Sequence, residues 1–312
     1  MPKFSVIIPL FNKENEIKNT LQSVLEQSFS DFEVIIIDDG STDKSLQIVS
    51  QFADNRISLI SKKNEGVSIA RNFGVKKAKS DYIAFLDADD YWYSNHLENL
   101  YSLIQKYPEN KWFAAAYEKK RTFKLTTKMN SPILNNGENW SGLVNDFFEH
   151  SFIDCLAWTS AVCFKKSFFI TLGGFNSNYT HGEDTDLWVR AALNFPLVFS
   201  NNVTSTHNLV GNNRSIEINM NNRKHFNLEQ FNAAEKTNTS LKKYLDLNRY
   251  SLAVQYKAFG NKIKFKEYAE TINLKNLNKK QQFLLNQNKK VLQLFFKLKA
   301  ISEKFGLRLS SF

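Results

Sequence analysis

Residues 34–43 are Val-Ile-Ile-Ile-Asp-Asp-Gly-Ser-Thr-Asp, four branched apolar residues followed at once by two carboxylates and a turn. An unbroken apolar run of this length is typical of a strand that is covered on both faces, as in a parallel sheet. Gly40 permits a tight turn, and the Ser, Thr and Asp after it can cap a helix. The stretch predicts one strand of an α/β sheet with polar side chains at its carboxyl end.

The residues on both sides repeat this alternation of strand and helix. Further strands are predicted at 5–9, 57–60 and 82–86, and helices at 16–27, from about 43, at 67–77 and around Leu97, Leu100 and Ile104. Such units build a mostly parallel sheet and bind ligands beyond the carboxyl ends of their strands. After residue 111 the pattern is less regular, and it predicts only a strand at 161–164 and a helix from Asp184 to about Leu193.

Polar clusters follow each of the four predicted strands, at residues 9–12, 38–41, 63–66 and 87–90. The carboxyl ends of parallel strands meet at one edge of a sheet, so we expect these clusters to face a single crevice.

The cluster Asp87-Ala88-Asp89-Asp90 offers hard oxygen ligands of the kind that suits Mg²⁺ or Mn²⁺. An EF-hand loop starting at Asp87 is excluded, because its fifth and sixth positions would be Tyr91 and Trp92. Acidic residues are also common at strand ends and helix caps, so this cluster alone leaves a structural role open.

Two other acidic motifs are equally ambiguous by themselves. Asp38 and Asp39 could bind a base or ribose, or could only close the turn. Residues 182–190, Gly-Glu-Asp-Thr-Asp-Leu-Trp-Val-Arg, begin an amphipathic helix with carboxylates, a pattern that as such indicates N-capping. Neither GxGxxG nor GxxxxGK[ST] occurs, which disfavours NAD and P-loop chemistry.

Taken together and in this order, five motifs resemble those of family 2 glycosyltransferases with the GT-A fold: residues 6–12, 37–43, 70–74, 85–90 and 182–188. The N-terminal stretch is especially similar to the bacterial spore-coat polysaccharide type. The match covers roughly residues 2–188. It implies a Rossmann-like, mostly parallel α/β domain at residues 1–222, with a donor half at about 1–110 and an acceptor half at about 111–222. Residues 223–312 contain only two Gly and no Pro, which predicts a separate helical C-terminal extension.

The resemblance implies roles in binding the donor nucleotide. Phe11, where the family usually has Tyr, would stack on the donor base, Asp39 would bind that base, typically uracil, and Arg71 would face the nucleotide. The other residues assigned to this site, all at the same strand ends, are Pro9, Asn12, Asn64, Asp87 and Ala88.

The resemblance also implies a metal site and a catalytic base. Asp89 would ligate Mg²⁺ or Mn²⁺ bridging the donor diphosphate, and Asp87 would contact the ribose or a metal-bound water. Asp184 would be the base, with Glu183 as the second candidate. His207 could be a third metal or diphosphate contact, or simply structural. Residues 212–215 could belong to a lid, and the candidates for an acceptor platform or for core packing are Trp158, Trp188 and Tyr179.

The implied function is inverting, metal-dependent transfer of a sugar, of the hexosyltransferase type. A nucleotide diphosphate sugar, most simply a UDP-sugar, would donate to a hydroxyl of a glycan or lipid-linked acceptor in cell-surface polysaccharide or lipopolysaccharide assembly. One alternative is a non-catalytic nucleotide-sugar-binding or membrane-docking module with the same fold. A sugar-phosphate nucleotidyltransferase is disfavoured, because its Gly-rich, Lys-containing N-terminal loop is missing from residues 9–12.

Positive charge is concentrated at the end of the chain. Residues 223–312 contain 19 Lys or Arg and 6 Asp or Glu, a net charge of +13 against +10 for the whole chain, so residues 1–222 carry −3. The motif-bearing part is thus slightly acidic, and no nucleic-acid partner is expected. Within 283–305, one approximate apolar face is formed by Leu284, Val291, Phe295, Leu298 and Phe305, and charge is supplied by Lys289, Lys290, Lys297, Lys299 and Lys304. This segment could be an interfacial helix near anionic lipid, or a helix packed on its neighbours.

Targeting features are absent from the sequence. No run approaches the roughly 20 apolar residues of a bilayer-spanning helix, and the N-terminus lacks a signal-peptide layout. Cys155 and Cys163 form no CxxC pair, so buried thiols are predicted. We expect a cytoplasmic protein, with contact at the inner face of the plasma membrane left open.

Overall fold

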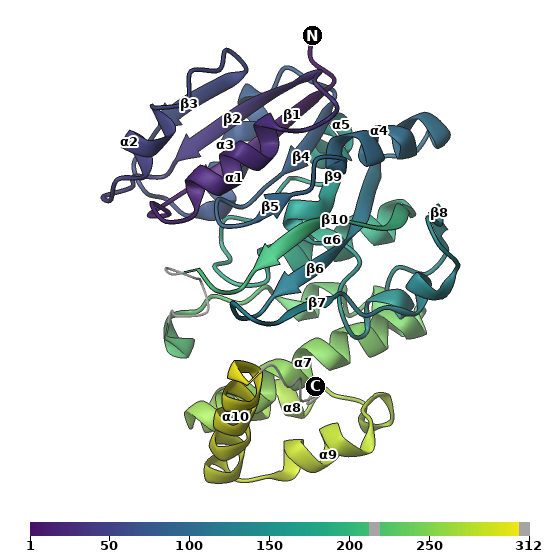
Figure 1. Ribbon diagram of the computed structural model, residues 1–312. Helices are drawn as coiled ribbons and strands as arrows, with labels where there is room; N and C mark the ends of the chain where they lie inside the picture. Colours follow the sequence, from purple (N-terminus) through teal and green to yellow (C-terminus); the bar gives the residue numbers. More distant parts are fainter. Residues whose placement is uncertain (212–218, 306–312) are drawn as a thin grey trace.

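The computed structural model describes residues 1–211 and 219–305, and it consists of an α/β domain followed by a smaller group of helices (Figure 1). Within these residues, ten strands form one sheet in the order β3-β2-β1-β4-β9-β6-β10-β5, with β7 paired to β6 and β8 to β10. The strands are β1 (Phe4–Leu10), β2 (Phe32–Asp38), β3 (Ile57–Ser61), β4 (Tyr82–Phe85), β5 (Tyr91–Trp92), β6 (Trp112–Lys120), β7 (Thr126–Lys128), β8 (Ser141–Val144), β9 (Val162–Lys165) and β10 (Leu197–Asn208).

The sheet is parallel in its first half and mixed in its second. Strands β3, β2, β1 and β4 are parallel neighbours, as the sequence predicted. The antiparallel strand β9 then joins β4 to β6, and β6 pairs in parallel with β10. Because β9 runs opposite to its neighbours, the carboxyl ends of β1, β2, β4, β6 and β10 all lie at the same edge.

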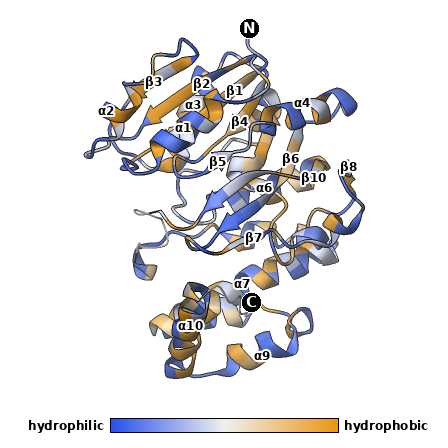
Figure 2. Ribbon diagram, in the orientation of Figure 1, coloured by the Kyte–Doolittle hydropathy of each residue, from blue (hydrophilic) through white to orange (hydrophobic). Residues whose placement is uncertain are grey.

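Helices cover both faces of the sheet. They are α1 (Ile17–Leu25), α2 (Ser45–Val49), α3 (Val67–Lys77), α4 (His96–Lys106), α5 (Lys166–Thr171) and α6 (Glu183–Asn194). Alternate strand residues belong to two separate apolar clusters, so that Ile8 packs with α1 and α4 and Ile7 with α3 and α6. This double coverage explains the apolar runs of β1 and β2, which are largely orange in Figure 2.

Gly74 allows α3 to lie close against the sheet. A Cβ atom at this position would come within 2.5 Å of Cγ2 of Ile7 on β1, a distance that side chains do not tolerate. The close approach sets the position of Arg71, one turn earlier on the same helix.

The C-terminal helices are α7 (Thr239–Phe259), α8 (Lys262–Ala269), α9 (Lys279–Asn286) and α10 (Lys289–Lys304). The first part of α7 packs into the large core, where Leu241, Tyr244 and Leu245 are buried. The second part joins α9 and α10 in a small core of its own. The helical extension is therefore attached through α7, while the proposed domain boundary at residues 222/223 stays a prediction.

Two further expectations from the sequence concern membrane-spanning helices and the two cysteines. In residues 1–211 and 219–305 there is no helix with both the length and the apolar character needed to span a bilayer. Cys155 and Cys163 are free thiols; Cys163 is buried as predicted, whereas Cys155 is partly exposed, although desolvation of its thiol raises the pKa of Cys155 to about 12.

Candidate active site

Asp39 lies just beyond β2 at the carboxyl edge of the sheet. Its side chain is buried and accepts hydrogen bonds from the backbone amides of Glu65 (3.0 Å) and Gly66 (2.7 Å), which precede α3. The ammonium group of Lys62 lies 2.6 Å from the same carboxylate. Asp39 is thus held by three hydrogen-bond donors. A nucleotide base would have to bind a carboxylate that already accepts these three interactions. Its role in binding the base stays a prediction.

The loop after β1 is held against the loop after β2 through Asn12. The Asn12 side chain accepts a hydrogen bond from the amide of Thr42 (2.8 Å), and the Asn12 amide donates to Ser41 Oγ (3.1 Å). Asn12 has a φ of 50°, in the left-handed region that asparagine tolerates better than most residues. Pro9 is buried in β1, whereas Phe11, in the loop that follows, is 36% exposed. Asn64 is exposed on the neighbouring loop.

Arg71 connects three of the sequence motifs. It is buried on α3, and its guanidinium group lies 2.6 Å from Asp87 Oδ1 and 3.2 Å from Glu183 Oε1. Burial alone would lower the pKa of Arg71, but the two carboxylates raise it above its ordinary value. Arg71 was expected to face the nucleotide, and in this structure it joins the end of β4 to the beginning of α6.

The acidic cluster after β4 divides into residues with different surroundings. Asp89 is partly exposed and its Oδ2 lies 2.8 Å from Nζ of Lys13. Asp90 is buried and accepts hydrogen bonds from Trp158 Nε1 (2.9 Å), Ser160 Oγ (2.6 Å) and the amide of Asn208 (2.8 Å). Burial, with the nearby charges of Asp89 and Asp87, raises the pKa of Asp90 well above its ordinary value. Asp90 therefore anchors the cluster to the end of β10, a role that the sequence analysis did not assign.

The carboxylates of this cluster fit a divalent cation that takes most of its ligands from a substrate. The described residues contain no group of three or more His, Cys, Asp or Glu side chains arranged to hold a metal. Asp89 Oδ1, however, has no hydrogen-bond partner among the described residues, and its side chain is 17% exposed. Mg²⁺ and Mn²⁺ commonly use one or two carboxylates together with phosphate oxygens and water. Asp89 meets that requirement, with Asp87 and the buried Ala88 beside it.

His207 lies next to the anchor of the acidic cluster. It stacks on the ring of Trp158, with ring centroids 3.7 Å apart, and the following residue, Asn208, donates its amide to Asp90. A contact from His207 to a metal or diphosphate stays a prediction, and residues 212–215, predicted as part of a lid, lie outside the described residues.

The expectation that Trp188 could form an acceptor platform is wrong. It is 1% exposed and stacks on Phe164 in the large core, at a centroid distance of 5.8 Å. Trp158 and Tyr179 are partly exposed and stay candidates.

The two carboxylates at the start of α6 differ in their environment. Glu183 pairs with Arg71, yet burial and the adjacent charge of Asp184 raise its pKa to about 7. Asp184 is partly exposed, makes no ion pair within the described residues, and accepts a hydrogen bond from the amide of Thr185 (2.6 Å). Because Asp184 is not engaged by Arg71 and is partly exposed, it is the carboxylate that an acceptor hydroxyl can reach, which favours Asp184 as the base.

Glu183→Gln should make the folded state more stable at pH 8 and only slightly more stable at pH 5. The raised pKa means that the folded protein binds this proton more tightly than the unfolded chain does. The charge on Glu183 therefore lowers the stability of the folded state increasingly as the pH rises from 4.5, the ordinary pKa of a glutamate, to about 7. Above pH 7 the full loss of stability persists. Removing the charge should add up to about 3 kcal/mol at pH 8, because each pKa unit corresponds to ~1.4 kcal/mol.

Thermal unfolding at both pH values measures this effect, with Glu109→Gln as a control for the loss of one exposed negative charge. A Glu183→Gln variant that melts below the wild type at pH 8 would show that the attraction of Arg71 outweighs burial and the repulsion from Asp184.

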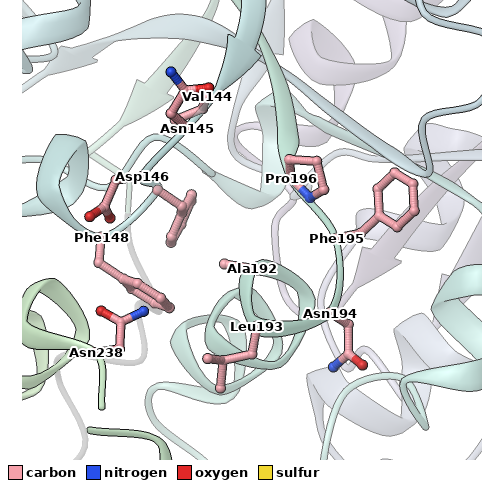
Figure 3. A pocket seen from close by; sticks show the side chains of 11 residues that line it. Val144, Asn145, Asp146, Phe148, Ala192, Leu193, Asn194, Phe195, Pro196 and Asn238 are labelled. Atoms are coloured by element: carbon pink, nitrogen blue, oxygen red, sulfur yellow. The ribbon is translucent and has the colours of Figure 1, made fainter.

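A pocket of about 330 Å³ lies away from these residues (Figure 3). It is lined by the end of α6, by residues after β8 such as Asp146 and Phe148, and by Asn238 before α7. Glu183 begins α6 at the carboxyl edge of the sheet and Asn194 ends it, so this pocket lies at the opposite end of the helix from the acidic motifs.

Comparison with known proteins identifies the family. The model of Glycosyl transferase family 2 matches residues 5–159. A curated relative, the glucosyltransferase WfgD of Escherichia coli, is 39% identical over 103 residues, which cover 33% of this chain and 41% of WfgD. The matched segments span between 14% and 41% of the length of the curated relatives compared.

Two solved structures share the fold over nearly the whole chain. Residues 1–349 of TarS from S. aureus superpose with a TM-score of 0.65 at 17% identity, covering 95% of this chain and 91% of that one. The mannosyltransferase PcManGT from Pyrobaculum calidifontis gives a TM-score of 0.56 at 15% identity, covering 97% and 88% of the two chains. With the motif residues gathered at the carboxyl edge of its sheet, residues 5–159 form a glycosyl transferase family 2 domain, and the chain has the GT-A fold.

Proposed function

We propose that this protein is an inverting, Mg²⁺- or Mn²⁺-dependent glycosyltransferase that uses a UDP-sugar and acts in cell-surface polysaccharide or lipopolysaccharide assembly. The observation that carries the proposal is the bridge through Arg71, which brings the Asp87 end of β4 and the Glu183 end of α6 to one edge of the sheet. This bridge supports placing the residues proposed for the donor diphosphate and for the base at the same edge of the sheet.

The donor and acceptor classes follow from the names of related proteins. TarS has been crystallised in complex with UDP-GlcNAc, and PcManGT in complex with GDP-Man and Mn²⁺. The name of WfgD specifies UDP-Glc as donor and a diphosphoundecaprenol-linked GlcNAc as acceptor. By analogy we propose a UDP-sugar donor and a glycan or lipid-linked acceptor for this chain.

The proposed reaction is a single displacement at the anomeric carbon. The acceptor oxygen forms a bond to this carbon as the bond to the diphosphate oxygen breaks, and the nucleotide diphosphate leaves from the opposite face. Asp184 takes the proton of the acceptor hydroxyl, which is too poor a nucleophile at neutral pH without a base. A cation bound at Asp89 would neutralise the charge on the departing diphosphate. Attack from the face opposite the leaving group inverts the anomeric centre.

UDP should stabilise the protein against heat when Mn²⁺ is present and much less when EDTA replaces it. At a free ligand concentration 100 times its dissociation constant, binding to the folded state alone adds about 2.7 kcal/mol. Asp89 lies next to Lys13, but its second oxygen can accept a cation that the diphosphate completes. A thermal-shift series with UDP, GDP and ADP, each with Mn²⁺ or EDTA, measures both the base preference and the metal dependence.

Equal stabilisation by UDP in Mn²⁺ and in EDTA would contradict the metal requirement. The same samples, supplied with UDP-sugars, should release UDP by hydrolysis or transfer. If UDP-sugars bind but no UDP is released with any donor, the proposed activity fails and a non-catalytic nucleotide-sugar-binding module becomes the better description.

A further inference from the structure

Helix α10 packs against the rest of the protein on one side only. Leu292 is 1% exposed in the small C-terminal core, and Gln293 Nε2 donates a hydrogen bond to the carbonyl of Ala258 at the end of α7 (2.9 Å). Phe296, one turn after Leu292, packs against the same core. These contacts fix which side of the helix faces inward.

The opposite side of α10 carries a row of exposed apolar residues, which we call the outer stripe. Leu294, Leu298, Ile301 and Phe305 are exposed by 57%, 48%, 51% and 81%, respectively. With 100° per residue, their positions fall within about 60° of one another around the helix axis, facing away from Leu292 and Phe296. Figure 2 shows α10 with both hydrophobic and hydrophilic segments, at the far end of the molecule from the N-terminus.

The outer stripe differs from the apolar face that the sequence suggested. Leu284 belongs to α9 and is 6% exposed in the small core, and Val291 is only partly exposed. The predicted set of residues was therefore wrong, because Leu284 lies on α9, which ends before α10 begins, and does not share a face with the residues of α10. Leu298 and Phe305 were identified, whereas Leu294 and Ile301 were missed.

The charges around the outer stripe are positive. Lys290 and Lys297 are exposed and lie along one border of the stripe by helical position. The acidic residue of the helix, Glu303, lies on the inward side and pairs with Arg121 at 3.4 Å. An apolar stripe bordered by lysines matches the interface of an anionic bilayer, where apolar side chains enter the acyl boundary and cations contact the headgroups.

A second copy of the chain is a poorer match. Residues 223–312 carry a net charge of +13, so apposing two outer stripes would bring two strongly positive regions together. Anionic lipid instead compensates this charge.

We propose that the outer stripe, with Lys290 and Lys297, docks the enzyme on an anionic lipid surface. The proposal deepens the proposed function, because it names the surface on which a lipid-linked acceptor would be met. The Arg121–Glu303 pair connects the last turn of α10 to Arg121, the residue that follows β6. Strand β6 pairs with β10, where Lys119 lies opposite His207. Docking through α10 would thus hold the carboxyl edge of the sheet, with its acidic cluster, in a fixed position relative to the lipid.

Vesicle flotation of the full chain tests the proposal. The wild type should float with vesicles of phosphatidylcholine and phosphatidylglycerol, and should remain unbound with pure phosphatidylcholine. The double variant Leu294→Ser/Leu298→Ser should bind at least about tenfold more weakly, since two half-exposed leucines no longer enter the bilayer. Lys290→Glu/Lys297→Glu should lose binding and its sensitivity to NaCl.

Ile170→Ser is the matched control, because Ile170 is 59% exposed and lies on α5 of the α/β domain. Its binding to vesicles should equal that of the wild type. All substituted side chains are exposed, so the variants should melt at the same temperature as the wild type. If Leu294→Ser/Leu298→Ser shows no folding transition, Leu294→Gln/Leu298→Gln takes its place.

Three results would overturn the proposal: no flotation of the wild type, equal binding to neutral vesicles, or full binding by both double variants. Sedimentation showing a concentration-dependent dimer that Leu294→Ser/Leu298→Ser abolishes, without vesicle binding, would instead assign the outer stripe to a second copy. UDP release from a UDP-sugar without vesicles should be the same in the wild type and in this variant. A wild type that binds vesicles but releases no UDP would overturn the proposed function and leave the docking surface intact.

Discussion

Asp89→Ala should lower the rate of UDP release from a UDP-sugar by about a thousandfold. The leaving diphosphate must be neutralised as its bond to the anomeric carbon breaks, and loss of one such electrostatic contact typically costs 10²–10³ or more in rate. Asp89 is partly exposed, and one of its carboxylate oxygens has no hydrogen-bond partner among the described residues. Asp90 cannot replace it, because three donors occupy its buried carboxylate.

Asp81→Ala is the matched control for this variant. Asp81 is exposed and precedes β4, whereas Asp89 follows it, so the two residues lie at opposite ends of the same strand. Assays of UDP release with saturating Mn²⁺ should give a wild-type rate for Asp81→Ala. The stabilisation by UDP and Mn²⁺ should disappear in Asp89→Ala. A rate within about threefold of wild type for Asp89→Ala would remove Asp89 from the reaction.

The donor half of the fold could be predicted because its signals are local. The strands β1, β2, β3 and β4 and the helix α3 agree with the sequence predictions to within about two residues at their ends. Strands β1, β2 and β4 are buried apolar runs, whereas β3 is a partly exposed edge strand, and a polar turn follows each of the four. In this region the sequence pattern and the tertiary environment coincide.

The second half of the sheet gave no comparable pattern. Strand β10 contains Ser200, Thr204, Ser205 and Thr206, which are polar and yet at most 1% exposed. They are buried because β10 lies between β6 and its antiparallel neighbours β5 and β8, and this pairing joins residues that are 53 to 115 positions apart in the sequence. Strand β6 contains three consecutive alanines, which show neither the hydrophobic periodicity of a helix nor the alternation of a strand.

The candidate site was predictable in its residue types but not in its connections. Asp87, Asp89, Glu183 and Asp184 were identified from motifs, yet the partner that joins Asp87 to Glu183 is the buried Arg71. The role of Asp90 depends on a partner 118 residues away. Such long-range hydrogen bonds leave no trace in local sequence spacing, so the anchoring of the cluster could be found only in the folded structure.

Asp184→Asn should lower the transfer rate by at least about a thousandfold while leaving donor binding intact. An amide cannot take the proton of the acceptor hydroxyl, and general base catalysis contributes roughly 10²–10⁴. The substitution is nearly isosteric, and the Asn oxygen can still accept the hydrogen bond from the Thr185 amide. Stabilisation by UDP and Mn²⁺ should therefore match the wild type, in contrast to Asp89→Ala, which separates the loss of the base from the loss of the diphosphate site.

Glu183→Gln is the control within the same helical turn. Glu183 is turned toward Arg71, and a glutamine can keep that contact as a neutral acceptor, so its loss of transfer should be much smaller than that of Asp184→Asn. Transfer to a defined acceptor, followed as product formed per enzyme at saturating donor, gives the comparison. If Glu183→Gln is the more damaged variant while Asp184→Asn transfers normally, the proton acceptor is Glu183. Its pKa of about 7 would then limit the reaction at acidic pH.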